Sequence, residues 1–193
     1  MIDYIRGEVA ELTPTYVVVD CGGVGYEINI TLLDNAELQG KTSAKLFVHE
    51  SIREDAHVLY GFLSSQTREY FRLLIGVSGV GPNTARLILS AMTVDQLGAA
   101  ISGGDSKVLK AVKGIGGKTA ERIIVDLKDK IKVGTDSLIG STAVSASGYE
   151  DALAALLMLG FAAPASKKAL DKLYKSDPSL SVELAIKMAL TML

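Results

Sequence analysis

The hydrophobic pattern changes its period once along the chain, close to residue 64. Before that point, runs such as residues 25–31 alternate apolar and polar side chains with a period of two, which is typical of β-strands with one buried face. After it, apolar residues recur every three or four positions, as they do on the buried face of a helix. We therefore expect a β domain that is followed by helical domains.

The first 63 residues contain five candidate strands and one short helical connection. Each strand candidate is β-branched or alternating in character, and Gly or Pro residues separate it from the next. Five short strands and one brief helix suit a small closed or nearly closed barrel, so we predict an OB-type β-barrel over residues 1–63, with a sandwich as the alternative. The expected strands are residues 4–12, 16–21, 25–31, 44–52 and 57–62, and the expected helix is residues 32–38.

Residues 64–133 repeat themselves with an offset of 35. Gly-Val-Gly at residues 79–81 corresponds to Gly-Ile-Gly at residues 114–116, and a Thr-Ala pair follows each turn at the same distance. Glycines on either side of one apolar residue permit a tight turn between helices, and the apolar residue can fill the angle between them. Two copies are too few for a solenoid, so the pattern predicts a pair of helical hairpins.

Each glycine turn leads directly into a helix, and this arrangement favours phosphate binding. The first backbone N–H groups of a helix lack intrahelical partners and carry the positive end of its dipole, so they bind phosphate without reading the bases. We expect positive φ at Gly116, where a phosphate would approach closely. The alternative is that the glycines serve packing alone. The candidate DNA-binding residues are Gly79, Val80, Gly81, Asn83, Thr84, Arg86, Gly114, Ile115, Gly116, Gly117, Lys118, Thr119 and Arg122.

The net charge of −2 conceals an uneven distribution. Residues 1–63 carry 4 Lys/Arg against 10 Asp/Glu, whereas residues 64–133 carry 11 Lys/Arg against 6 Asp/Glu. A basic segment inside an acidic protein indicates a local surface for a polyanion such as nucleic acid. The alternative is a solvated basic helix face.

Several classes of protein do not fit the composition. Cys21 has no partner for an internal disulfide, and His49 and His57 form no cluster with metal-ligand spacing, so we expect neither a metal nor a cofactor. The longest apolar run, residues 152–163, is shorter than the roughly 20 residues that a membrane span needs. The N-terminus lacks the pattern of a signal peptide. These features predict a cytoplasmic protein.

Residues 116–119, Gly-Gly-Lys-Thr, resemble the end of a nucleotide-binding P-loop. That motif requires glycine at position 112, where this chain has Val112, and the preceding residues are helical in pattern rather than strand-like. The sequence therefore does not predict ATP binding at this turn.

The last third of the chain contains a change of composition. Residues 134–148 are rich in Gly, Ser and Thr, which is typical of a flexible linker. Residues 149–193 show helical spacing in three short segments, at about 149–159, 164–174 and 181–193. We expect a small three-helix domain that carries no chemical motif and suits a tethered docking module.

The motifs together resemble helix–hairpin–helix proteins, and among them the RuvA family of bacterial Holliday-junction proteins. That resemblance implies an OB-type barrel, a double helix–hairpin–helix domain over residues 64–133, a flexible linker and a three-helix domain. It rests on Gly22-Gly-Val-Gly-Tyr-Glu, Arg53-Glu-Asp-Ala, Leu59-Tyr-Gly-Phe, Gly79-Val-Gly-Pro and Gly114-Ile-Gly-Gly-Lys-Thr-Ala-Glu-Arg.

The resemblance also implies function and partners. A member of this family is a non-catalytic subunit that binds four-way junction DNA as a homotetramer, or as two stacked tetramers, in recombination, repair and the SOS response. Residues 149–193 would contact a RuvB-type hexameric ATPase, and a RuvC-type resolvase is a further expected partner. Glu54 and Asp55 match the family's acidic pin, which lies near the point of strand exchange. Gly117 and Asn83 depart from the family, because relatives often have basic residues there, so we expect somewhat weaker or less salt-sensitive binding.

Two other functions remain as alternatives. A helix–hairpin–helix glycosylase would need an aromatic pocket and a catalytic residue beyond the hairpin, for which Asp126 or Asp129 could be nominated, but the chain has no Trp. A nuclease would need clustered carboxylates, and residues 54–55 offer one pair. A single-strand binder that uses the barrel face is disfavoured by the acidic charge of residues 1–63.

Overall fold

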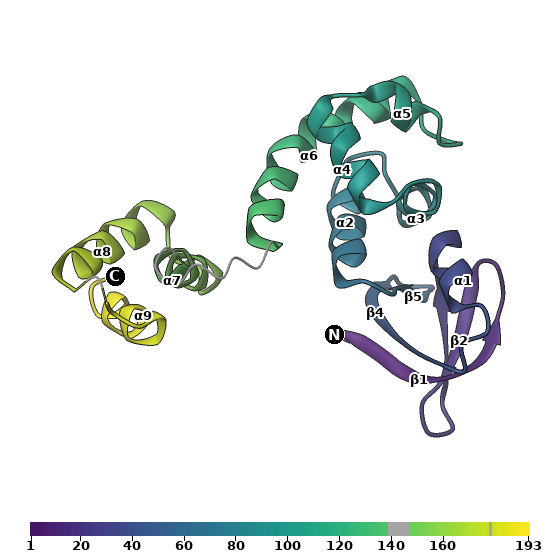
Figure 1. Ribbon diagram of the computed structural model, residues 1–193, viewed down its shortest axis with the longest axis horizontal. Coiled ribbons are helices and arrows are strands. Elements are labelled where there is room, and N and C mark those ends of the chain that lie inside the picture. The colour runs from purple at the N-terminus through teal and green to yellow at the C-terminus, as the bar shows by residue number, and fades with distance from the viewer. Residues whose placement is uncertain (139–146, 178) are drawn as a thin grey trace. The chain divides into compact units, whose positions relative to one another are not determined.

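The computed structural model describes the backbone of residues 1–138, 147–177 and 179–193, and the side chains of residues 1–131, 148–177 and 179–193 (Figure 1). Two compact units divide the chain, Met1–Leu138 and Ile139–Leu193. The first unit contains the barrel and the hairpin helices, which share contacts, and the second contains the C-terminal helices.

The five predicted strands form a closed barrel. Its strand order is β1-β2-β3-β5-β4, and β4 pairs with β1 to close the sheet. All pairs are antiparallel except β3 with β5. The structure confirms the barrel and excludes the sandwich. The elements are β1 (Tyr4–Leu12), β2 (Tyr16–Asp20), β3 (Gly25–Asn29), α1 (Leu32–Leu38), β4 (Ser43–Ile52) and β5 (His57–Phe62).

The barrel closes because alternate side chains fill its interior and small residues allow close approach. Val17, Ile28 and Leu46 are fully buried inside it. A Cβ atom at Gly61 in β5 would stand 2.4 Å from Cγ2 of Ile28 in β3, a distance no real Cβ shows. A glycine at this position therefore lets β5 pack beside the side chain of Ile28.

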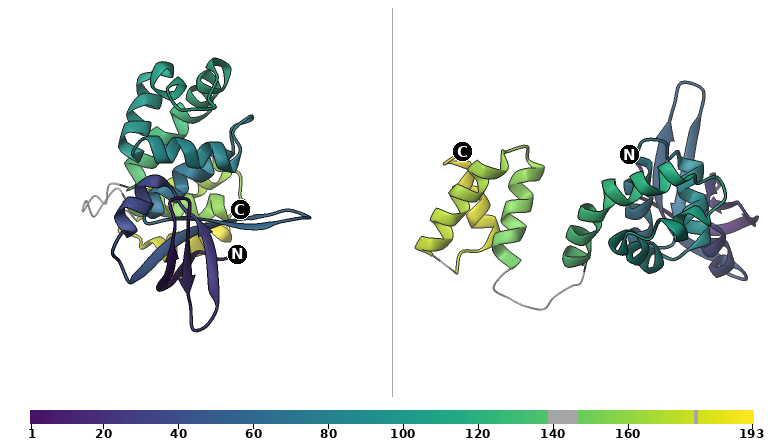
Figure 2. Two further views of the ribbon diagram at one scale, coloured as in Figure 1. Left: turned by 90° about the vertical axis from the view of Figure 1, so that its right-hand side faces the viewer. Right: turned by 90° about the horizontal axis from the view of Figure 1, so that it is seen from above.

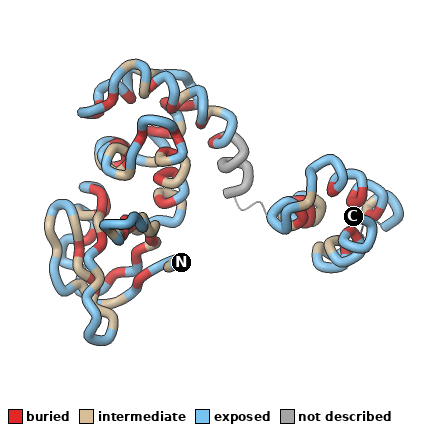
Figure 3. The backbone as a smooth tube through the Cα atoms, turned by 180° about the vertical axis from the view of Figure 1, so that it is seen from behind, coloured by how far each residue is buried: buried red, intermediate tan, exposed pale blue. Residues whose placement is uncertain are grey.

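Five further helices complete the first unit, and α2 among them packs against β4 and β5. Phe71 in α2 lies with its ring centroid 5.0 Å from that of Phe62 in β5, so the core of the helices includes residues of β5, while the interior of the barrel forms a separate cluster. Buried positions occur in both the barrel and the helices (Figure 3). Thr93 caps α4 in a capping box with Gln96, as its sequence context indicates. The helices are α2 (Ser65–Ile75), α3 (Pro82–Ala91), α4 (Val94–Gly103), α5 (Ser106–Lys110) and α6 (Gly117–Leu138).

The segment predicted as a linker, residues 134–148, is helical at both ends. Helix α6 continues to Leu138, and α7 begins at Ser147, so both helices extend into residues 134–148. A helix that has formed adds residues at little cost, so a Gly- and Thr-containing segment can continue it. Residues 139–146 of the predicted linker lie outside the described residues.

The second unit is a small helical bundle, as its spacing predicts (Figure 2). Its helices are α7 (Ser147–Met158), α8 (Ala163–Ser176) and α9 (Val182–Leu190), and all three contact one another. Leu156, Leu170 and Ala185 are fully buried between them. Within the part of the chain that the structure describes, no helix combines the length and apolar character needed to cross a membrane.

Candidate nucleic-acid interface

The two glycine turns have matching backbone geometry. The N–H of Val80 donates to the carbonyl of Val77 at 3.0 Å, and 35 residues later the N–H of Ile115 donates to the carbonyl of Val112 at 3.1 Å. Helices α2 and α3 flank the first turn, and α5 and α6 flank the second. The sequence repeat is therefore a repeat of local structure.

The left-handed position of each turn is its first glycine. Gly79 has φ of 89° and Gly114 has φ of 91°. Gly116 is not among the positive-φ glycines, so our expectation of positive φ there is wrong. The chain reverses at the first glycine, before the apolar residue. The second glycine has a φ outside the left-handed region, and any residue can adopt it. A Cβ atom at Gly116 would meet no protein atom within 4 Å, which leaves open space in front of the turn.

The apolar residue of each turn belongs to the core. The side chains of Val80 and Ile115 are buried, with 4% and 6% of their surface exposed. They pack in the cluster that contains both hairpins and thus fill the angle between the helices, as predicted. Only the backbone of these two residues can face a ligand.

The helix after each turn presents free backbone donors. In α6 the first i→i−4 bond runs from the N–H of Ala120 to the carbonyl of Gly116, at 3.0 Å, and in α3 it runs from Ala85 to Gly81, at 2.9 Å. The N–H groups before these bonds point out of the helix end. Pro82 removes one donor from α3, so α6 offers more donors than α3 does.

Arg86 in α3 is engaged with the barrel. Its Nη1 donates to the carbonyl of Thr15 at 2.9 Å and to Oδ1 of Asn29 at 2.9 Å. One helical turn further on, Oγ of Ser90 accepts the N–H of Leu32 at 3.1 Å. Helix α3 therefore joins the hairpins to the barrel, a role that the sequence did not reveal because it depends on packing between distant segments.

The second hairpin carries most of the exposed positive charge. Lys118 and Arg122 are exposed at the start of α6, and the half-buried Thr119 lies between them. Lys113 in the turn and Lys110 at the end of α5 are also exposed, although the sequence analysis did not select them. The 35-residue repeat locates this turn, and both lysines lie within four residues before its first glycine, so their place in the sequence could have identified them.

The acidic pair lies at the tip of the β4–β5 hairpin. The N–H of Arg53 donates to the carbonyl of Ala56 at 2.8 Å, which closes a turn with Glu54 and Asp55 at its exposed apex. The hairpin projects from the barrel (Figure 2). These carboxylates therefore lie on a protruding arm of the barrel, whereas the basic turn lies between α5 and α6.

Glu50 holds the base of this arm. Its Oε2 accepts the backbone N–H of Ile2 at 2.7 Å, and its Oε1 lies 3.3 Å from Nε2 of His57. The hydrogen bond from Ile2 keeps the pKa of the Glu50 carboxyl below its usual value. These contacts fix the base of the arm to the residues that precede β1, whereas Glu54 and Asp55 at its tip are exposed.

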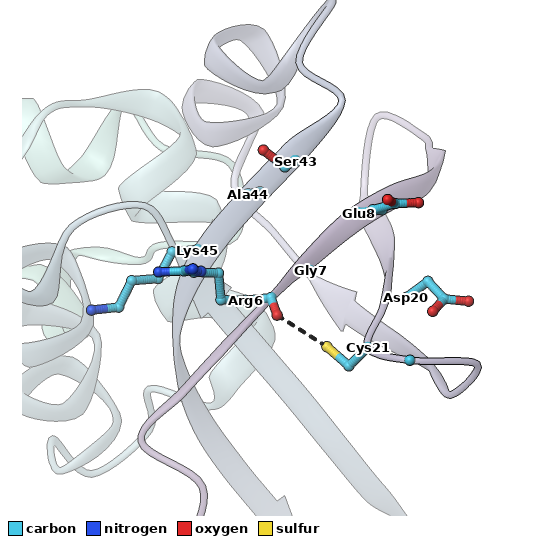
Figure 4. Close-up of a pocket in the computed structure, with 9 residues that line it drawn as sticks. Arg6, Gly7, Glu8, Asp20, Cys21, Ser43, Ala44 and Lys45 are labelled. Atoms are coloured by element: carbon cyan, nitrogen blue, oxygen red, sulfur yellow. Dashed lines mark hydrogen bonds between the residues drawn. The ribbon is translucent and has the colours of Figure 1, made fainter.

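A hollow of about 890 Å³ lies on the barrel between β1, β2 and β4 (Figure 4). Arg6 and Lys45 extend toward one side, Glu8 and Asp20 lie on the other, and Sγ of Cys21 donates to the carbonyl of Arg6 at 3.3 Å. Mixed charge with no aromatic lining gives this hollow none of the features of a flipped-base pocket.

The side chains nominated for an enzyme do not converge. Asp126 and Asp129 are exposed on α6. Among the residues whose side chains the structure describes, no group of three or more His, Cys, Asp or Glu is placed to hold a metal ion.

A closed five-stranded barrel joined to two glycine-turn hairpins defines a class, the helix–hairpin–helix proteins that contact nucleic-acid backbones. Three family models match the chain: RuvA N terminal domain over residues 1–61, SAM-like Helix-hairpin-helix tandem over residues 71–129, and RuvA, C-terminal domain over residues 147–193. The chain belongs to the RuvA family.

Curated relatives match over nearly their whole length. The relative from Bacteroides fragilis is 52% identical over 98% of both chains, and the one from Porphyromonas gingivalis is 49% identical over 100% of both. A relative from Flavobacterium psychrophilum is 43% identical over 98% of both chains. Each of these proteins is named Holliday junction branch migration complex subunit RuvA.

Proposed function

We propose that this chain is the Holliday-junction-binding subunit of a branch-migration complex, and that it holds DNA through sequence-independent contacts to phosphates. The observation that carries the proposal is the pair of equivalent turns at residues 79–81 and 114–116, each with open space and free N–H donors in front of it. Membership of the RuvA family and the names of the relatives agree with it.

The subunit has no catalytic role of its own. Its candidate donors and cations suit binding of phosphates, and among its described residues no three or more His, Cys, Asp or Glu are placed to hold a metal ion. We infer that ATP hydrolysis belongs to a separate motor of the RuvB type. Residues 149–193 would dock that motor, because they form a compact unit of their own.

The chain acts as a homotetramer on the junction. A fourfold arrangement gives each of the four equivalent DNA arms one copy of the hairpin pair. The arms of Glu54 and Asp55 would then meet near the strand-exchange point, where carboxylates repel phosphates and keep the strands apart. Two stacked tetramers on one junction, and contact with a RuvC-type resolvase, are extensions of the same proposal.

A reconstituted branch-migration reaction tests the function. A RuvB-type ATPase, a synthetic four-way junction with homologous arms and ATP are mixed with or without this chain. We expect strand exchange to depend on the chain, on ATP and on the junction. The proposal is wrong if the chain binds the junction and engages the ATPase yet adds nothing to branch migration. It is also wrong if the purified chain, without the ATPase, cleaves DNA or removes bases from it.

A further inference from the structure

The two hairpins share a backbone but differ in charge. At equivalent positions, 35 residues apart, the first hairpin has neutral residues where the second has Lys or Arg. Arg86 in α3 is bonded to the barrel. In α2, Arg68 is paired with Asp3, and Arg72 is paired with Glu69. Salt-sensitive contact with DNA would therefore come from the second hairpin. The pairs are Ile75 and Lys110, Ser78 and Lys113, Asn83 and Lys118, and Leu87 and Arg122.

Lys110, the last residue of α5, lies beside the start of α6. Its Cε and Nζ stand 3.2 and 3.4 Å from the position that a Cβ atom would take at Gly117, the first residue of α6. Because Gly117 has no side chain, the ammonium of Lys110 occupies the space beside the helix end. Lys118, the next residue of α6, contributes a second exposed cation at the same end.

The ammonium of Lys110 lies near two helix ends of opposite sign. The C-terminal end of α5, where Lys110 is the last residue, favours a cation, and the N-terminus of α6 disfavours one. The N-terminus of a helix carries about half a positive charge, which repels an ammonium and attracts a phosphate. Oε1 of Glu121 lies 3.9 Å from Nζ of Lys110, and the Glu121 side chain is 68% exposed. A pair at that distance and exposure contributes little. The arrangement therefore suits a ligand from outside the chain.

We propose that Lys110 is a phosphate-binding residue of the second hairpin, with its ammonium at the open end of α6, where Lys118 and the free N–H groups meet the same DNA backbone. This inference rests on the proposed function. It adds a contact from α5, outside the turn and the helix that follows it. It also locates the positive charge that position 117 itself lacks.

The competing interpretation is a purely structural pair between Lys110 and Glu121 that joins α5 to α6. The two interpretations predict effects of one variant on different properties, DNA affinity in the first case and thermal stability in the second. If Lys110 binds phosphate, Glu121→Gln removes a nearby negative charge and strengthens DNA binding. If the pair is structural, Glu121→Gln and loss of the Lys110 charge lower the melting temperature alike.

The test compares four full-length variants on a four-way junction and on linear duplex from 50 to 200 mM salt. Lys110→Met removes the charge and keeps the aliphatic stem beside Gly117. Lys110→Met with Gly117→Lys returns a charge to the same place by another route. Glu121→Gln tests the pair, and Lys130→Met is the matched control, since Lys130 is exposed on α6 about 20 Å along the axis from its start.

We expect Lys110→Met to reduce the slope of log affinity against log salt by about 0.9 for each bound copy, so that its affinity falls about threefold less per copy over this salt range. The double variant should recover the wild-type slope, and Lys130→Met should keep it. The inference is wrong if Lys110→Met keeps the wild-type slope, or if Glu121→Gln weakens binding. If the wild-type chain shows no salt-sensitive DNA binding, the proposed function itself fails.

Discussion

Arg86 shows how one residue can join two domains. Its guanidinium gives two hydrogen bonds to the barrel, to Thr15 and Asn29. We expect Arg86→Ala to destabilise the chain by about 1.5–3 kcal/mol, the range for hydrogen bonds from a charged group. Thermal or urea unfolding measures this loss.

Lys118→Ala is the contrasting variant, because Lys118 is exposed at the start of α6. It should leave stability unchanged and lower the salt slope of DNA binding by about one for each bound copy. Arg86→Ala should leave that slope near the wild-type value. Our assignment of Arg86 to the domain junction fails if its loss lowers the slope and spares stability.

Asp34 gives the first unit a pH-dependent term in its stability. Burial raises the pKa of the Asp34 carboxyl, although hydrogen bonds from Thr31 and the backbone N–H of Leu63 act in the opposite direction. A pKa that is higher in the folded state stabilises the fold below the unfolded pKa, about 3.9, and this contribution is lost as pH rises through the folded pKa.

We therefore expect Asp34→Asn to gain stability relative to the wild type as pH rises from about 4 to 7, since Asn cannot ionise and its Oδ1 can still accept the N–H of Leu63. Urea unfolding across this range measures the difference. Glu27→Gln, at an exposed position of β3, is the control. A difference between Asp34→Asn and wild type that is constant with pH would refute the argument.

At the scale of the element, the two glycines of the second turn have different tasks. Gly114 has φ of 91°, so Gly114→Ala should cost about 1–2 kcal/mol of stability. Gly116 has no such φ and open space around its Cβ position. Gly116→Ala should therefore keep stability and weaken DNA binding, because the methyl group occupies the place where a phosphate approaches.

Gly103→Ala is the control for both variants, since a Cβ atom there also meets open space but lies on α4 outside the turns. It should change neither stability by more than helix propensity allows, about 1 kcal/mol, nor DNA affinity. The account of the turn is contradicted if Gly116→Ala and Gly103→Ala bind DNA equally well.

Removing the charge of the acidic arm should change DNA affinity in the opposite direction from removing the charge of the basic hairpin. Glu54→Gln with Asp55→Asn removes repulsion of phosphates while leaving the Arg53–Ala56 turn bond in place. Affinity for linear duplex should hold or rise, and preference for the junction should fall. Competition between the two DNAs measures this change. Weaker binding to every DNA, with unchanged preference, would exclude the acidic-pin role.

Elements and turns followed from local pattern, whereas long-range partners did not. Alternating residues in 1–63 predicted the barrel strands, and the 35-residue repeat predicted both turns, because period and glycine spacing reflect local geometry. The barrel contact of Arg86 and the approach of Lys110 to Gly117 depend on packing between separate elements. Which glycine is left-handed depends on the turn's hydrogen bond, so the sequence pattern led us to Gly116 instead of Gly114.

At the scale of the whole molecule, the chain divides at residue 138 into two compact units, and we propose that each has its own function. Residues 1–138 contain the barrel core and a helical core that includes residues of β5, and the C-terminal unit has its own core. A chain that ends at Leu138, the last residue of α6, should keep junction affinity within tenfold and lose stimulation of a RuvB-type ATPase. A larger loss, above about 1.4 kcal/mol, would assign junction binding to the C-terminal unit as well.

The central claim is that the full chain recognises the form of a four-way junction through its phosphates. The most direct measurement is a competition gel shift between a four-way junction and a linear duplex of equal length, repeated with two unrelated sequences and accompanied by the mass of the complex. The account predicts preference for the junction by about tenfold or more, equal for both sequences, with four or eight copies bound. Equal affinity for junction and duplex, or a preference that follows the sequence, would contradict it.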